Sequence, residues 1–104
     1  MTGWEPTTGD RWGGRPIARR LADVAPRRRV VVTGTIVATG RSSWRRAPAF
    51  VGRLDDDTGL LTLVFGGPRA VPGMGTGAVC TVEGTALTHG GALFLWDPFY
   101  RFEP

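Results

Sequence analysis

The chain has 104 residues, a formal net charge of +4 and a sequence pI of about 11.0. This length corresponds to one domain with a small core, and the absence of lysine excludes Schiff-base chemistry and a Walker-type phosphate loop. A single cysteine, Cys80, excludes an internal disulfide, and no apolar run approaches the roughly 20 residues of a membrane-spanning helix.

All 13 basic residues are arginine, and this usage has two competing causes. Arginine forms planar, bidentate contacts with phosphate, but a GC-rich genome also replaces lysine by arginine without functional demand. The chain lacks Asn and Gln and is rich in Gly, Ala and Pro, which favours codon bias. The positive charge therefore favours an anionic partner, whereas the choice of arginine over lysine does not. Because the N-terminus has no apolar signal segment, we expect a cytoplasmic protein.

The first quarter of the chain predicts an arm followed by a short helix. Residues 1–15 are rich in Gly, Thr and Pro and predict a flexible arm that carries two tryptophans, Trp4 and Trp12. Apolar residues then recur at helical spacing between two prolines, which predicts a short helix over 16–25 packed outside the main domain. The basic run Arg27–Arg29 leads into the first strand.

The remaining residues, within a single domain over 16–104, alternate at period two and predict five strands. Residues 28–39 are β-branched, with Gly34 marking a bulge or a sharp bend, and residues 40–48 predict a polar loop. A hairpin with an acidic turn follows over 49–67. Residues 78–87 and 92–96 are the fourth and fifth strands. Glycines inside the strands let a short sheet curl, so the pattern predicts an all-β, five-stranded barrel over 28–102.

An ordered set of motifs resembles the nucleic-acid-binding OB-fold family, and in particular the wedge domain of RecG-type DNA helicases. The resemblance covers residues 28–102 and includes an Asp-x-Thr-Gly turn before an apolar strand and a Pro-x-Tyr after the last strand. The motifs are Val30–Ile36, Phe50–Gly59, Leu61–Phe65, Gly77–Gly84 and Asp97–Tyr100. The chain looks like a small stand-alone OB protein of a GC-rich, actinobacterial-type bacterium. Since no helicase domain is attached, the resemblance implies binding alone.

Catalysis and metal binding are both disfavoured by the residues present. One His and one Cys cannot supply a four-ligand zinc site, and Asp55, Asp56 and Asp57 are better explained as a structural turn than as a cation site. No serine lies in a nucleophile-elbow pattern, and His89 falls in a turn. We therefore expect no catalytic residue, no metal, no cofactor and no enzymatic activity.

The segment Arg41–Arg46 carries the strongest binding signal, because a tryptophan flanked by arginines suits single-stranded nucleic acid. Trp44 would stack on a base while Arg41, Arg45 and Arg46 neutralise phosphates. The alternative is that Trp44 folds back over the end of the barrel and the arginines are merely solvated.

Further candidates lie on the strands. Arg53 falls on the exposed face of the hairpin with Thr62, unless it pairs with Asp55. Arg69 extends the positive field, and Tyr100 either stacks bases or closes the core.

We therefore expect non-catalytic binding of nucleic acid, most of all single-stranded DNA, with RNA as the other possibility. Sequence selectivity should be low, because the chain has no Asn or Gln to read base edges. No membrane partner is expected. The alternative function is a protein-interaction module, in which exposed Trp4 and Trp12 dock onto a larger DNA-processing protein.

Overall fold

The computed structural model describes residues 4–104, and their regular structure is almost entirely β-strand. The one helical element in the described residues is a three-residue 3-10 turn, so none of their helices is long and apolar enough to cross a membrane. The elements in chain order are β1 (Arg11–Trp12), β2 (Arg15–Pro16), η1 (Leu21–Asp23), β3 (Arg29–Trp44), β4 (Ala47–Asp55), β5 (Leu60–Gly66), β6 (Val79–Thr85), β7 (Leu87–His89), β8 (Ala92–Trp96) and β9 (Phe99–Phe102).

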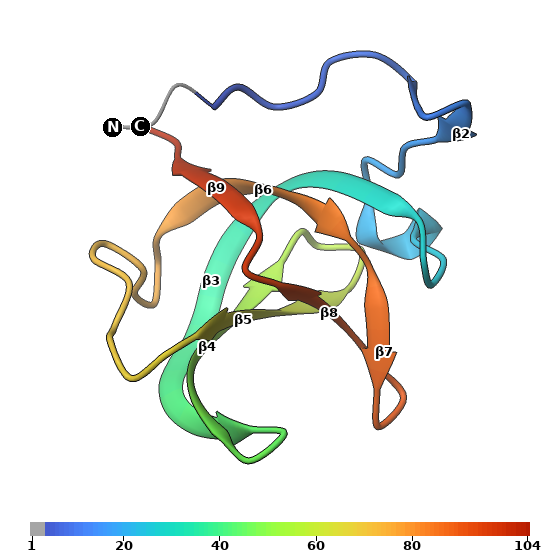
Figure 1. The fold of residues 1–104 in the computed structure, drawn as a ribbon. Coiled ribbons are helices and arrows are strands. Elements are labelled where there is room, and N and C mark those ends of the chain that lie inside the picture. Colours follow the sequence, from blue (N-terminus) through green and yellow to red (C-terminus); the bar gives the residue numbers. More distant parts are fainter. Residues whose placement is uncertain (1–3) are drawn as a thin grey trace.

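Seven of these strands form one curled sheet in the order β7-β8-β5-β4-β3-β6-β9 (Figure 1). Neighbours pair antiparallel except β5 and β8, which run parallel. The all-β prediction is confirmed, but the predicted closed barrel is not found, because no pairing in the described residues joins the two end strands. Instead, the two ends of the sheet are linked by the chain itself, because β6 near one end continues through Ala86 into β7 at the other end.

The long strand β3 organises the sheet by pairing first with β6 and then with β4. Gly34 lies where the partner changes, and a Cβ atom there would stand 2.6 Å from the carbonyl oxygen of Asp55. The bulge falls three residues later, at Val37, which is skipped in the register with β4. The polar loop predicted over 40–48 is wrong, because β3 extends to Trp44 and turns through two residues into β4.

The helix predicted over 16–25 is also wrong, and the reason is where its main-chain groups bond. Ala18 forms a bridge with Val30, so it hydrogen-bonds to β3 rather than within a helical turn. Only Leu21–Asp23 is helical, and the N–H of Leu21 donates to the carboxylate of Asp56 at 2.8 Å. The acidic turn therefore fixes this segment to the sheet, as a structural element.

The core lies inside the curl of the sheet. Val30, Ile36, Leu54, Leu63 and Val82 are among its fully buried residues. They come from the inward-facing positions of β3, β4, β5 and β6, in keeping with the alternation along each strand. Cys80 is buried with them as predicted, and its burial, with a smaller contribution from Glu103, raises the pKa of its thiol to about 11.

The sequence predicts a flexible arm over residues 1–15, and the described part of it makes specific contacts with the sheet. Thr7 donates its N–H and hydroxyl to the carboxylate of Glu83, at 2.9 and 2.6 Å. Trp12 lies under the guanidinium of Arg29, and Trp4 stacks on Phe99. The arm thus follows the outer side of β6 and β9 (Figure 1).

Candidate functional site

The outer face of β3, β4, β5 and β8 is the candidate site, and it is defined here by strand register. Side chains opposite one another in a ladder lie on the same side of the sheet. Three rows follow from the pairings: Ala38, Arg53, Thr62 and Phe94; then Gly40, Val51, Val64 and Trp96; then Ser42, Ala49 and Gly66. We call these rows the outer face.

Small residues form the floor of the outer face. Four of its residues have no large side chain, namely Gly40, Ser42, Ala49 and Gly66. Of the two valines, Val51 is half-buried and Val64 is buried. The ring of Trp96 lies over Gly66, where a Cβ atom would stand 3.0 Å from that ring. Ala49 and Val64 are buried, whereas Gly40 and Ser42 are exposed, so a ligand can approach the sheet on the β3 side of this floor.

Trp44 lies at the end of β3 and packs against the neighbouring hairpin. Its ring centroid is 4.7 Å from that of His89 and 5.0 Å from that of Phe94. The indole is half-buried in a small cluster with Ala49 and Val64. It therefore joins the β3–β4 hairpin to the β7–β8 hairpin and does not project freely into solvent.

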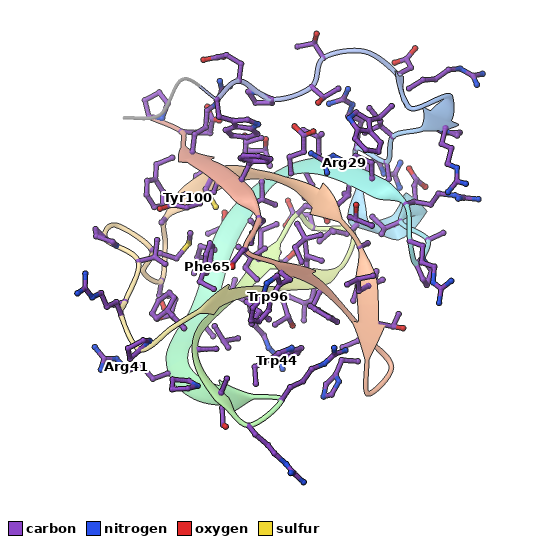
Figure 2. The ribbon with its side chains drawn as sticks, viewed as in Figure 1. Arg29, Arg41, Trp44, Phe65, Trp96 and Tyr100 are labelled. Atoms are coloured by element: carbon purple, nitrogen blue, oxygen red, sulfur yellow. The ribbon has the colours of Figure 1, made fainter. Side chains whose placement is uncertain are left out.

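A hollow of about 390 Å³ opens beside Trp44, between the two hairpins. Trp96 forms part of its wall and is 47% exposed, so one indole here is available to a ligand. Figure 2 shows Trp44 and Trp96 in the same lower part of the molecule. The lining residues are Trp44, Arg45, Ala47, Leu87, Phe94 and Trp96.

Three exposed arginines border the outer face. Arg45 and Arg46 form the two-residue turn between β3 and β4, with φ values of 51° and 68°. Arg53 lies within the first row, next to Thr62. None of the three forms an ion pair in the described part of the chain, and Asp55 instead accepts the N–H of Asp57. Their charges are therefore not neutralised within the protein.

The other predicted site residues lie at the margin of the outer face or away from it. Arg41 is opposite Phe50 in the ladder, but it lines a hollow of about 170 Å³ together with Arg53. Figure 2 shows Arg41 apart from Trp44. Arg69 is exposed in the connection between β5 and β6. Tyr100 packs edge-on against Phe65, 5.5 Å between centroids, and belongs to the margin of the core.

The sequence offers Trp96 as one of the aromatic residues at the end of the last predicted strand that could stack on bases, but Phe94 was missed. Phe94 and Trp96 alternate on β8 and so share one face, a signal that the sequence does contain. Phe99 and Tyr100 follow Trp96 closely in the sequence but do not contribute to this site, since Phe99 stacks on Trp4 and Tyr100 packs edge-on against Phe65. The approach of His89 and Leu87 depends on how two hairpins meet, which the sequence does not show.

The acidic turn is held by hydrogen bonds of its own. Asp56 accepts hydrogen bonds from Thr58, Gly59 and Leu21. Although burial raises the pKa of Asp56, these hydrogen bonds outweigh it and lower the pKa below its ordinary value. Within residues 4–104, no group of three or more His, Cys, Asp or Glu side chains is arranged to hold a metal ion.

Comparison with known proteins identifies the fold. No protein-family model matches the chain, and no curated protein does. Among solved structures, the OB domain of Ta0387 from Thermoplasma acidophilum is similar, with a TM-score of 0.62 and 16% sequence identity. The match covers 84% of this chain and 87% of that one. The chain therefore has an OB fold, an architecture whose members differ widely in what they bind.

Proposed function

We propose that the protein binds single-stranded nucleic acid on the outer face, without catalysis, and that it prefers single-stranded DNA to RNA. The observation that carries the proposal is the combination found on that face. A floor of small residues lies between uncompensated arginines and an exposed indole.

Each part of this face suits one part of an unpaired strand. Trp96 offers a plane on which a base can stack, a contact that contributes about 1–3 kcal/mol per base and tolerates any sequence. Arg53 and the Arg45–Arg46 turn provide positive charge for the phosphates on either side. The exposed floor residues Gly40 and Ser42 let the strand approach β3 closely. Because the chain has no Asn or Gln, it lacks the side chains that read adenine edges, and we expect low sequence selectivity.

The test is the binding of a fluorescein-labelled oligo-dT, followed by fluorescence anisotropy at low salt. We expect Trp96→Ala to weaken binding about 10-fold, in line with the loss of one stacked base, and Arg53→Ala to weaken it as well. The matched controls are Trp12→Ala and Arg20→Ala. Trp12 is an equally exposed indole on the N-terminal arm, and Arg20 is an exposed arginine next to Asp23.

The controls decide the interpretation. Binding that all four variants weaken equally would show a diffuse electrostatic association and not a site on the outer face. No anisotropy change with DNA or RNA at any salt concentration would contradict the proposal. The same labelled strand made of RNA distinguishes between the two nucleic acids.

A further inference from the structure

Within residues 4–104, strand β9 pairs with β6 alone, so its second edge has no strand partner there. The N–H of Glu103 donates to the carbonyl oxygen of Val79 at 2.8 Å. In an antiparallel ladder, hydrogen-bonded pairs alternate with pairs whose N–H and C=O groups point the other way. Arg101 therefore bonds toward β6, whereas the main-chain groups of Tyr100 and Phe102 point away from it. An edge of this kind can pair with another strand.

A groove runs along this strand. Its volume is about 670 Å³, and its lining contains every residue from Pro98 to Phe102 together with Trp4 and Glu5 of the arm. Phe99 and Phe102 are 52% and 39% exposed. The groove thus extends along the whole of β9, and its lining is apolar except for Glu5 and Arg101.

We propose that β9 pairs antiparallel with β9 of a second copy of this chain, across a two-fold axis at Tyr100. Such an interface uses the same surface on both subunits. In this register the N–H and C=O of Tyr100 bond to those of Tyr100 in the second copy. The N–H of Phe102 donates to the carbonyl oxygen of Pro98 in the second copy. Pro98 has no N–H, so this position leaves no donor of its own without a partner.

Charge favours this register over the neighbouring one. With the axis at Tyr100, Phe99 of each copy lies opposite Arg101 of the other and on the same side of the sheet, which gives two cation–π pairs. With the axis at Arg101, the two Arg101 side chains would face each other and Phe99 would lie opposite Glu103, so both cation–π pairs would be lost. Self-complementarity of this kind is the reason to assign a second copy of the chain, and not an unrelated peptide, to the groove.

The side chains concerned are able to make these contacts. The Nε and Nη1 atoms of Arg101 donate to Glu103 and Glu5, at 2.9 and 3.2 Å, within the plane of the guanidinium. A guanidinium bonded in its plane keeps its flat face for an aromatic ring. Trp4 covers one face of the Phe99 ring, and the exposure of Phe99 leaves the other face to a partner.

The first test is amide hydrogen exchange on the unaltered protein at increasing concentration. We expect exchange at Tyr100 and Phe102 to slow as the protein associates, while exchange at Arg101 and Glu103 stays constant because β6 already protects them. Over the same range, sedimentation should show the mass rising from 11.2 kDa toward twice that value. Exchange that is independent of concentration, or a mass that stays at the monomer value, overturns the proposal.

The second test swaps the two side chains of the proposed cation–π pair. Phe99→Arg places two arginines opposite each other and should abolish association, and adding Arg101→Phe should restore it by reversing the pair. The control Leu60→Arg adds the same charge at an equally exposed apolar residue on β5 and should leave association unchanged. Circular dichroism confirms the fold of each variant. If the double variant stays monomeric while folded, the register is refuted.

Discussion

Gly34 shows how one residue is fixed by the sheet around it. A Cβ atom there would stand 2.6 Å from the main-chain oxygen of Asp55 and 2.8 Å from the side chain of Leu54. Because a main-chain atom cannot swing aside as a side chain does, β3 or β4 must move. We expect Gly34→Ala to lower the free energy of unfolding by about 1–3 kcal/mol, as overpacking does, measured by urea denaturation.

The control for this prediction lies on the same strand. A Cβ atom at Gly40 meets nothing within 4 Å, so Gly40→Ala should change stability by a few tenths of a kcal/mol or raise it slightly. Equal losses in the two variants would show that β propensity, and not contact with Asp55, accounts for the effect.

The role of a single residue could be predicted from the sequence only where its contacts are with residues close to it in the chain. The sequence indicates that Gly34 is a special position, because a glycine within a β-branched run marks a bulge, a bend or a close approach of another backbone. The sequence does not show that Gly34 makes room for the main chain of Asp55, which lies 21 positions away in the sequence. The same holds for Trp44, whose neighbours His89 and Phe94 come from the β7–β8 hairpin, more than 40 positions later in the sequence.

At the scale of the element, the N-terminal arm is attached through Glu83 of β6. This carboxylate is 1% exposed and accepts hydrogen bonds from Thr7 and from Arg29, whose Nε and Nη2 lie 3.0 and 2.9 Å from Oε2. Burial by itself raises the pKa of Glu83, but these bonds outweigh it, so the pKa is lowered from its ordinary value of 4.5.

A lowered pKa sets the sign of the pH dependence. The stability that Glu83 contributes is fully present above the pKa of the unfolded chain and is lost as the pH falls through the lower pKa of the folded state. We expect Glu83→Gln to cost about 1–3 kcal/mol at neutral pH and to converge on the unaltered protein below pH 4.5. Thermal melts between neutral and acidic pH measure this.

The exposed arm residue Glu5 supplies the control, since its side chain is 76% exposed in its pair with Arg101. Glu5→Gln removes the same charge and should have a small effect, as exposed ion pairs do. A loss as large as that of Glu83→Gln would mean that the charge itself matters and not the buried bonds to Thr7 and Arg29.

Helices and strands could be predicted where they are stabilised by interactions between residues close in the sequence. The β4–β5 hairpin and its Asp-Asp-Asp-Thr-Gly turn follow from alternation and turn chemistry, and both are present. The helix over 16–25 failed because its main chain found partners on β3, and helical spacing in a ten-residue segment is weak against such tertiary bonds. The attachment of the arm depends on Glu83, which the sequence shows only as one residue of an alternating strand.

At the scale of the whole molecule, the positive charge is spread over more than one surface. Seven of the 13 arginines lie between residues 11 and 29, whereas Arg45, Arg46 and Arg53 border the outer face. Net charge alone therefore does not identify where a polyanion binds. The salt dependence of binding does, because each phosphate neutralised at the interface contributes about 0.7 to the slope of log K against log salt for a single strand.

This leads to a prediction with two variants of equal charge. Arg45→Asn with Arg46→Gly keeps a turn that both residues tolerate at positive φ, and it should lower the slope for oligo-dT by about 1.4. Arg15→Gln with Arg28→Gln removes two exposed charges at the other cluster and should leave the slope nearly unchanged, because those arginines meet no phosphate. Titrations at four or more salt concentrations give each slope. If the second pair lowers the slope as much as the first, the strand contacts the N-terminal arginines, and the outer face is not where the protein holds it.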